Sequence, residues 1–455
     1  MVVTPVRILR TGSVCTLTFG IGYFMLLLMS IENRVDDFSF VDVDADDMSR
    51  DALLANQMMA VEANNNLPSN VNYSRPFPPD DTCYFQDKLS GGGMPDIHSA
   101  FADPIGGYIV FVGLKFLPDP WDILNYTFQY ENEEAVDCND ILKDRRNIGF
   151  MPQYMLVITC PLTDAVRMKK QFVGTLKSSE NKTYENITIC TSGVSLAKKQ
   201  FLSICTMVRS VDDFIPDWLD FHRYVGVEHV YIYDNEHPDA TTLPKTLKEY
   251  TEDGYVTIIP WHHSTSPMKT YLEVQIAHEN DCIWRHKHDV DWMIKIDVDE
   301  YVQPMDPKRT KIPDYLRDPW FRHLSAIRMS NWFFGHPKSI KPKGPTIIHR
   351  NMWRSKEPTM QNTGHDKNIL RPINVHYFKI HNVKMGSDTL SADPYDELRL
   401  VHYRGDNPRA LHFELPQFTE RDSSMLTLQM KAQYDKEQKA KEKAARAMKE
   451  KAAKG

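Results

Sequence analysis

The stretch DWMIKIDVDEYV, residues 291–302, combines two opposing features. Its first half, WMIKI, is an apolar run typical of a buried strand. Three carboxylates follow within four residues, at Asp297, Asp299 and Glu300. At a separation of about 4 Å and an effective dielectric constant near 20, each close pair of like charges costs roughly 4 kcal/mol. A folded protein therefore needs a reason to hold these side chains together at the end of a core strand.

The sequence from residue 201 onward alternates between short apolar runs and segments with helical periodicity. FLSICTMV, EHVYIYDN, YVTIIPW and DWMIKIDVDEYV are the predicted strands. Strands that alternate with helices predict an α/β domain with a mostly parallel sheet flanked by helices. In such sheets ligands bind beyond the carboxyl ends of the strands, which is where Asp234, Asp297 and Asp299 fall.

A divalent cation would relieve the repulsion among the three carboxylates. Mg²⁺ and Mn²⁺ prefer oxygen ligands, and they commonly use one or two carboxylates together with substrate phosphates. If those phosphates are the leaving group of a sugar donor, the cation stabilises the charge that develops as the bond breaks. Asp-x-Asp also occurs within 41–47 and 288–292, but only Asp297-Val298-Asp299 follows an apolar strand at the expected ligand-binding edge.

The N-terminus predicts a membrane anchor. Residues 13–31 carry no charge and are long enough to cross a hydrocarbon layer of ~30 Å as a helix. Arg7 and Arg10 precede this span, which indicates a cytosolic tail over residues 1–12 and a lumenal remainder. A cleaved signal peptide is the alternative. We expect a single-pass type II protein of the Golgi membrane.

Sequons and cysteines agree with a lumenal location. The sequons begin at Asn72, Asn125, Asn181 and Asn186. Apart from Cys15, the cysteines form an even set that an oxidising lumen could pair: Cys83, Cys138, Cys160, Cys190, Cys205 and Cys282. Cys205 and Cys282 fall inside predicted elements, so buried free thiols are the alternative for these two.

Composition changes along the chain indicate its further parts. Residues 32–80 are acidic and then rich in Asn and Pro, which predicts a flexible stem. Residues 81–200 contain short β-rich runs and predict a small β-rich accessory domain. The α/β domain spans 201–420, and the tail at 421–455 is almost all Lys, Glu and Ala near its end, which predicts an exposed helix or a solvated segment. The net charge of −7 argues against a nucleic-acid partner.

Several blocks, in this order, resemble the catalytic domain of glycosyltransferase family 92, a GT-A-type group that includes galactosyltransferases of animals and plant galactan synthases. The blocks are SICTMVRS, DWLDFHRYVGVEHVYIYDN, QIAHENDCIWR, MIKIDVDEYV, KNILRPINV and LVHYR. The resemblance covers residues 201 to about 418 and lies in the order and spacing of the blocks. It implies an inverting, metal-dependent transfer from a UDP-sugar, UDP-galactose above all, to a glycan acceptor such as a polysaccharide, glycoprotein or glycolipid.

The resemblance also implies roles for individual residues. Asp297 and Asp299 would bind the metal ion, Mn²⁺ or Mg²⁺, and through it the diphosphate, with Asp299 as the direct ligand. His402 would complete the metal shell, and His381 is the alternative ligand. A buried His without metal is the competing interpretation of His402.

Four further residues are candidates for contacts with the nucleotide. Asp234 would accept a hydrogen bond from uracil, unless it only organises the turn that follows. Arg209 would meet uridine or phosphate, unless it is an ordinary loop arginine. Asp281 and Arg285 lie one helical turn apart, so they could face the nucleotide or pair with each other.

An inverting transfer needs a base within hydrogen-bonding reach of the acceptor hydroxyl. Glu357 and Asp366 lie in the interval where this fold usually places that base, and the sequence does not choose between them. A set of aromatic side chains could form a stacking floor for a sugar or simply pack in the core: Trp332, Phe333, Phe334 and Trp353.

Two other hypotheses compete with the transferase. A phosphohydrolase of the haloacid dehalogenase type also places Asp-x-Asp after a buried strand, but it normally has Thr or Val where this chain has Tyr301. A membrane-tethered carbohydrate-binding protein without turnover is the non-enzymatic alternative.

Overall fold

The computed structural model describes residues 89–452 except 92–93, 117–124, 132, 149–150, 168, 181, 192–199, 264–270, 360–363 and 404–416. The predicted anchor at 13–31, the stem at 32–80 and the sequons at Asn72 and Asn181 lie outside these residues. Among the described helices none is long and apolar enough to cross a membrane.

The first part of the described chain is a β-barrel. Its strands are β1 (Leu89–Gly91), β2 (Met94–Asp103), β3 (Tyr108–Phe116), β4 (Tyr126–Tyr130), β5 (Ala135–Ile148), β6 (Met151–Pro161), β7 (Gln171–Ser178) and β8 (Thr183–Thr191), with the short helix α4 (Asp164–Arg167). They pair in the order β1-β2-β3-β6-β5-β4-β7-β8, and β2 also pairs with β8. The sheet therefore closes on itself within the region for which β-rich runs were predicted.

The second part contains a seven-stranded sheet in the order β11-β10-β9-β12-β17-β14-β20. Its strands are β9 (Gln200–Val208), β10 (His229–Asp234), β11 (Val256–Pro260), β12 (Val290–Lys295), β14 (Ala326–Met329), β17 (Lys367–Leu370) and β20 (Thr389–Ser391). The four strands predicted from the sequence, β9 to β12, are parallel, whereas β17 runs antiparallel to both β12 and β14. Strand β14 is parallel to β20, so the sheet is mostly parallel, as predicted, but mixed, because β17 runs against its other strands.

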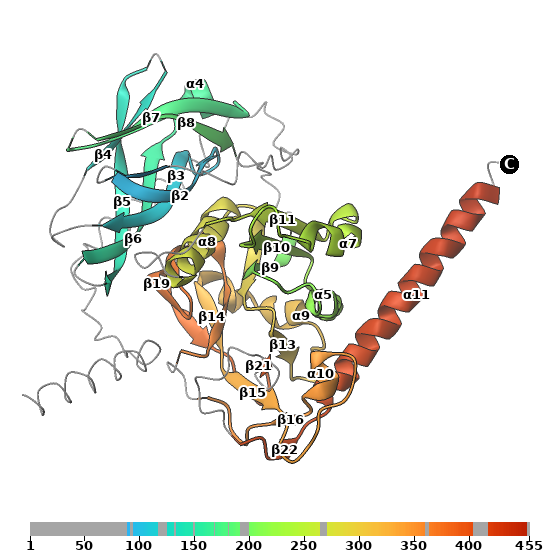
Figure 1. The fold of residues 1–455 in the computed structure, drawn as a ribbon. Coiled ribbons are helices and arrows are strands. Elements are labelled where there is room, and N and C mark those ends of the chain that lie inside the picture. The colour runs from blue at the N-terminus through green and yellow to red at the C-terminus, as the bar shows by residue number, and fades with distance from the viewer. Residues whose placement is uncertain are drawn as a thin grey trace, which may run out of the picture. The chain divides into compact units, whose positions relative to one another are not determined.

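Helices cover both faces of this sheet (Figure 1). They are α5 (Ile215–Tyr224), α6 (Leu243–Thr246), α7 (Lys248–Glu252) and α8 (Tyr271–Arg285). Trp218 and Leu219 of α5 pack against Ile204 on one face. Ile276 and Ile283 of α8 pack on the other face, where the outward side chains of β2 and β3 join them. Alternating residues of the central strands thus enter two different cores, as the pleat requires.

Residues 291–302, which were predicted to be one strand, are divided between two sheets. DWMIKIDVDEYV forms β12 and then β13 (Glu300–Pro304), and these belong to different sheets. The sheet of β13 has the order β13-β21-β15-β16-β22, from β21 (Leu398–Tyr403), β15 (Asn331–Gly335), β16 (Trp353–Arg354) and β22 (Glu420–Arg421). The remaining elements are the hairpin β18 (Val375–Lys379) and β19 (Asn382–Gly386), which packs against α8, the helices α9 (Ile312–Leu316) and α10 (Ile347–Arg350), and the 3-10 turns Pro319–His323 and Pro372–Asn374.

Disulfides staple both parts of the chain. Cys138 pairs with Cys160 between β5 and β6, and Cys205 pairs with Cys282 between β9 and α8. Cys190 is disulfide-bonded as well. The alternative of free buried thiols at Cys205 and Cys282 is therefore wrong, and the pairing is the kind that an oxidising compartment maintains.

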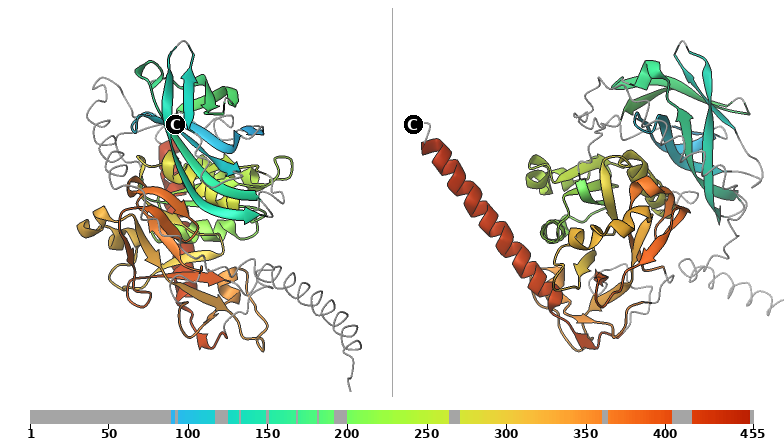
Figure 2. Two further views of the ribbon diagram at one scale, coloured as in Figure 1. Left: turned by 90° about the vertical axis from the view of Figure 1, so that its left-hand side faces the viewer. Right: turned by 180° about the vertical axis from the view of Figure 1, so that it is seen from behind.

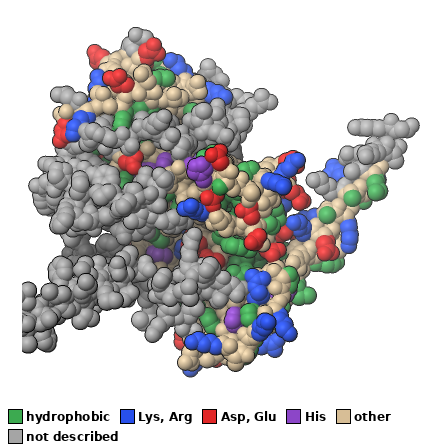
Figure 3. Space-filling model, in the orientation of Figure 1, with side chains coloured by type: hydrophobic (Ala, Val, Ile, Leu, Met, Phe, Trp, Pro, Cys, Tyr) green, Lys and Arg blue, Asp and Glu red, His purple; other side chains and the backbone are tan. Residues whose placement is uncertain are grey.

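The charged tail is a helix, α11 (Ser424–Ala452). Its first turns are anchored, because Met425, Gln429 and Ala432 are buried against neighbouring elements. Lys436 pairs with Asp220 of α5 at 2.8 Å. Beyond this point α11 extends away from α5 and α10 (Figure 2), and Lys and Arg side chains recur along it (Figure 3). The tail is thus an extended helix with a packed base rather than a wholly solvated segment.

His222 joins α5 to β13 in the buried core. Its Nδ1 donates to the Trp218 carbonyl at 2.9 Å, and Nε2 accepts from the Val302 N–H at 3.4 Å. Burial lowers the pKa of His222 to about 3, although the bond to the Trp218 carbonyl opposes the change. The folded protein therefore holds this imidazole neutral.

We expect His222 to make the fold sensitive to acid. Because its folded pKa lies below the unfolded value of 6.5, the unfolded state binds the proton first, and stability falls as the pH drops from 6.5 towards 3. Between pH 6.5 and 4, wild type should lose up to about 3 kcal/mol more than His222→Gln. Urea denaturation at several pH values measures this, and parallel profiles for the two proteins would contradict it.

Candidate functional site

The acidic turn lies where the chain leaves the seven-stranded sheet and enters the next one. The Glu300 N–H donates to the Asp297 carbonyl at 3.0 Å, and the Asp297 N–H donates to the Glu300 carboxylate at 2.8 Å. The Trp218 indole N–H of α5 donates to the Glu300 carbonyl at 2.7 Å. Glu300 therefore fixes the backbone of the turn, and this backbone carries the Asp297 and Asp299 carboxylates.

His402 of β21 lies beside the turn because it is the register partner of Glu300. Its Nε2 lies 3.6 Å from Asp299 Oδ2, and its Nδ1 lies 3.3 Å from Glu300 Oε1, a close contact without the alignment of a hydrogen bond. The ring packs near Phe333, with centroids 5.5 Å apart. A carboxylate behind an imidazole, as Glu300 is behind His402, is the usual support of a metal-binding His. His402 and Asp299 could therefore supply two ligands to an ion.

Asp297 is engaged by a lysine that the sequence analysis did not single out. Lys367 Nζ lies 2.7 Å from Asp297 Oδ2 and 3.3 Å from Glu300 Oε2, and its side chain is 6% exposed. Burial raises the pKa of Asp297, but the Lys367 ammonium more than offsets this and leaves it below the usual value. Lys367 arrives because β17 begins beside the end of β12, a pairing that local sequence patterns do not reveal.

The residues fit a metal ion only in part. In the ranges that the structure covers, no three His, Cys, Asp or Glu side chains are grouped so that they could hold a metal ion. Asp299 and His402 can supply two ligands, while the Asp297 oxygen faces Lys367. Mg²⁺ and Mn²⁺ sites often take their remaining ligands from water and substrate phosphates. The side chains therefore fit an ion shared with a diphosphate better than a closed protein site.

A second charged pair lies beneath the turn. Lys295 Nζ donates to the Cys205 carbonyl at 3.0 Å and lies 2.9 Å from His278 Nε2. Glu279 of α8 accepts the Ile380 N–H at 2.8 Å, in a hairpin tip where Ile380 has a φ of +42°. Burial raises the pKa of Glu279 to about 7 and lowers that of Lys295 to about 8. Lys295 and Glu279 together carry no net charge, and Glu279 fixes the hairpin next to the site.

His381, the alternative ligand, belongs to that hairpin tip. Its Nδ1 lies 2.6 Å from the Asp366 carbonyl, and its own carbonyl accepts from the Asn368 side chain at 2.8 Å. Burial lowers the pKa of His381 to about 3. These contacts hold the loop between β18 and β19 in place, whereas His402 is the histidine that faces Asp299.

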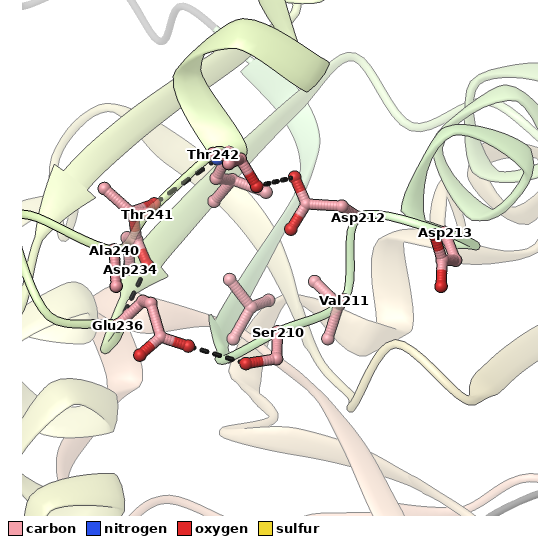
Figure 4. A pocket seen from close by; sticks show the side chains of 11 residues that line it. Ser210, Val211, Asp212, Asp213, Asp234, Glu236, Ala240, Thr241 and Thr242 are labelled. Carbon is pink, nitrogen blue, oxygen red and sulfur yellow. Dashed lines mark hydrogen bonds between the residues drawn. The ribbon is translucent and has the colours of Figure 1, made fainter.

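A pocket of about 250 Å³ opens at the carboxyl ends of β9 and β10 (Figure 4). Asp234, the predicted uracil partner, lies at its edge. Its Oδ1 accepts the Glu236 N–H at 3.0 Å, and its Oδ2 accepts the Thr241 hydroxyl at 2.6 Å. Ser210 donates to Glu236 at 2.6 Å across the mouth. Asp234 therefore shapes the loop that bounds the pocket, and any ligand contact would use its remaining lone pairs.

Arg209 follows β9 next to this pocket. Its side chain is 49% exposed, and Nε lies 3.6 Å from Glu236 Oε1. Both are at the edge where ligands bind in α/β sheets. The arginine is accessible to a phosphate or a ribose.

Asp281 and Arg285 of α8 pair with each other. Both Asp281 oxygens accept from Arg285, at 2.9 and 3.1 Å. Tyr233 donates to Asp281 Oδ2 at 2.5 Å, and Ser99 of the barrel also donates to Asp281. Arg285 covers the Phe101 ring at 4.1 Å. Of the two predicted alternatives, the structure has the mutual pair, which fastens the barrel to α8.

The family profile of glycosyltransferase family 92 matches residues 198–454, more than half of the chain. The chain belongs to glycosyltransferase family 92. The resemblance identified in the sequence is confirmed, and the match runs through α11 as well. Membership in this family gives no support to the phosphohydrolase hypothesis.

Curated relatives of this family 92 chain are distant. It is 25% identical over 119 residues to a glycosyltransferase family 92 protein of Ricinus communis, covering 26% of this chain and 21% of the relative. It is 23% identical over 216 residues to a beta-1,4-galactosyltransferase of Caenorhabditis elegans, covering 47% of each. The chain thus spans from a fifth to about half the length of these relatives.

Solved structures resemble the family 92 chain only weakly. The mannosyltransferase PcManGT from Pyrobaculum calidifontis, in complex with GDP-Man and Mn²⁺, is 13% identical with a TM-score of 0.26, over 47% of this chain and 59% of that one. TarS of S. aureus in complex with UDP is 11% identical with a TM-score of 0.28, over 46% and 62%. Similarities at this level do not assign a function.

The two base candidates of the family 92 domain lie in different surroundings. Asp366 is 1% exposed, and its carboxylate lies 3.3 Å from Arg328. Glu357 is exposed and accepts a hydrogen bond from the Tyr395 hydroxyl at 2.6 Å. Glu357 is therefore the candidate that a hydroxyl group from solvent can reach.

The aromatic set does not form an open floor. Trp332 is 2% exposed, and its indole N–H donates to the Ser355 carbonyl at 2.8 Å. Phe333 and Phe334 are also buried, and Trp353 is half-buried. The exposed aromatic ring beside them is Tyr395, which is 51% exposed and stands edge-on to Trp332. Core packing is the role of Trp332, Phe333 and Phe334.

We expect Asp281→Ala to destabilise the protein by about 3–5 kcal/mol, because it leaves the Arg285 guanidinium buried without its partner. Denaturant unfolding of both proteins measures the difference. The matched control is Glu252→Ala, which removes an exposed carboxylate from an i,i+4 pair with Lys248 and should cost less than about 0.5 kcal/mol. An Asp281→Ala variant as stable as the control would show that the buried pair contributes little.

Proposed function

We propose that this chain is an inverting, metal-dependent glycosyltransferase that moves galactose from UDP-galactose to a glycan acceptor in the secretory pathway. The observation that carries the proposal is the convergence of Asp299 and His402 after the central strand β12. A pocket opens at the carboxyl ends of β9 and β10, which lie at the same edge of the sheet as the end of β12. Family 92 membership supports sugar transfer. UDP-galactose as donor rests on the resemblance and on the galactosyltransferase from Caenorhabditis elegans among the relatives.

Each part of the site has a role in this proposal. Asp299 and His402 would hold Mn²⁺ or Mg²⁺, which supplies positive charge to the departing diphosphate. Glu300 orients His402 and fixes the turn. Asp234 bounds the pocket that would take the uridine, and Arg209 is exposed beside it for a phosphate or ribose.

Glu357 is our proposed base. Its carboxylate is accessible, and the Tyr395 hydroxyl holds it in one place. The backbone around it is tied to β15, since the Ser355 N–H donates to the Phe333 carbonyl at 3.0 Å and Phe333 packs on His402. Asp366 would have to break its ion pair with Arg328 before it could act as the base.

We propose a location in the secretory pathway, with an anchor in the Golgi membrane. The disulfides Cys138–Cys160 and Cys205–Cys282 support an oxidising compartment. The uncharged stretch 13–31 supports a type II anchor in the sequence.

A carbohydrate-binding protein without turnover is the second candidate. The engagement of Asp297 by Lys367 favours it, because one carboxylate of the Asp-x-Asp pair then faces an ammonium group. Binding of UDP with Mn²⁺ and no transfer to any glycan in an acceptor array would support this alternative.

A screen of UDP-sugars that follows UDP release tests the transferase. We expect turnover of UDP-galactose with Mn²⁺, loss of turnover with EDTA, and recovery when Mn²⁺ is restored. Asp299→Ala should lower turnover by about 10²-fold or more, because it removes a metal ligand at the developing charge. Its melting temperature should stay near that of wild type.

The matched control is Asp164→Ala, which removes an exposed carboxylate from the barrel. Unchanged turnover in Asp299→Ala would mean that the metal site lies elsewhere. Equal turnover with and without EDTA would show that the transfer needs no metal ion.

Glu357→Gln should lower kcat by about 10²–10⁴-fold while the KM for the donor changes little, because a general base acts on the acceptor. The acidic limb of the pH–rate profile, where protonation of the base lowers the rate, should also disappear. Glu180→Gln, at an exposed position of the barrel, is the control. A kcat within threefold of wild type would exclude Glu357 as the base.

A further inference from the structure

Among the residues that the structure describes, Lys367 is the lysine that contacts Asp297 directly. It pairs with Asp297 and Glu300 at once and is almost fully buried. Asp297, in contrast, keeps 46% of its side chain exposed. A carboxylate that is open to a ligand on one side is therefore held by an ammonium group on the other.

This contact affects any cation that enters the site. The formal charges of Asp297, Asp299 and Glu300 sum to −3, and Lys367 brings the sum of the four to −2. A divalent ion near Asp297 would meet the repulsion of the ammonium group at short range. The lone ion is therefore left with two ligands, Asp299 and His402, and with a positive neighbour.

A diphosphate reverses this balance. Its oxygens supply the ligands that the protein set lacks, as is usual for Mg²⁺ and Mn²⁺. Its negative charge is also attracted by the same ammonium group that repels a lone cation. The donor and the ion thus stabilise each other in the site, and Lys367 is what makes each depend on the other.

We propose that Lys367 is a positioning residue that keeps Asp297 out of the metal shell, so that the site binds a divalent cation tightly only together with the nucleotide diphosphate. The inference rests on the proposed metal-dependent function. It goes further by making the binding of the cation and of the diphosphate depend on each other and by naming the residue responsible.

The competing explanation is that Lys367 only stabilises the fold as a buried ion pair. The two explanations predict opposite results for cation binding. A purely stabilising lysine, when removed, lowers the melting temperature and leaves the affinity for Mn²⁺ unchanged or weaker. A lysine that withholds Asp297 from the ion, when removed, makes Mn²⁺ bind more tightly in the absence of nucleotide.

The experiment titrates Mn²⁺ into the full chain in detergent and follows the signal of free Mn²⁺ by electron paramagnetic resonance, with and without UDP. In wild type, UDP should raise the apparent affinity for Mn²⁺ at least tenfold. Lys367→Met should bind Mn²⁺ alone at least tenfold more tightly than wild type, and UDP should then add little. The double variant Lys367→Met/Asp297→Asn should lose this gain.

Two variants serve as controls. Lys367→Arg keeps the charge and should stay within threefold of wild type. Lys338→Met removes an exposed lysine and should change nothing. If melting shows that Lys367→Met is unfolded, Lys367→Gln replaces it, because the amide can still donate to Asp297 without carrying charge.

The outcomes separate this inference from the proposed function. In one outcome, wild type binds Mn²⁺ with UDP, but Lys367→Met binds Mn²⁺ alone no more tightly than wild type does. That result overturns the role of Lys367 and leaves the proposed transferase function intact. Wild type that binds no Mn²⁺ even with UDP overturns both. A gain in Lys367→Met that survives Asp297→Asn also overturns the inference, because the freed carboxylate is then not its source.

Discussion

The reciprocal pair of hydrogen bonds between Asp297 and Glu300 is the constraint on which the site depends. It turns the chain out of β12 and starts β13 in another sheet within four residues. The register of β13 with β21 then brings His402 opposite Glu300, and the antiparallel strand β17 brings Lys367 to the same corner. A side chain that was expected to add to the repulsion is thus the one that closes the turn.

The three carboxylates avoid mutual repulsion by taking different partners. Asp297 faces Lys367, and Asp299 faces His402. Glu300 accepts a backbone N–H and contacts both Lys367 and His402. Burial raises the pKa of Glu300, although Lys367 opposes the change. The question raised by the sequence therefore has a different answer from the one expected: the protein itself supplies partners that relieve much of the repulsion, and in the proposed function the cation would serve the chemistry.

The sequence predicted what depends on local pattern. The apolar runs of β9, β10, β11 and β12 and the helical periodicity between them were enough for the parallel half of the sheet, and the blocks of sequence were enough for the family. The break after Asp299, the antiparallel β17 and the contact of Lys367 with Asp297 depend on pairing between distant segments, which no local pattern carries. The same limit left Asp281 with two possible roles, because its partners Ser99 and Tyr233 come from a barrel strand and a sheet strand.

Helix α8 is the element through which the barrel and the site affect each other. Its residues Asp281 and Arg285 bind the barrel strand β2, and Cys282 is bonded to β9. One turn earlier, His278 and Glu279 contact Lys295 and the hairpin tip at Ile380. Because an α-helix places residues three to four apart on one side, the same stretch of α8 reaches the barrel, Lys295 and the hairpin tip. Helix α8 therefore connects the barrel strand β2 to the strand that ends two residues before Asp297.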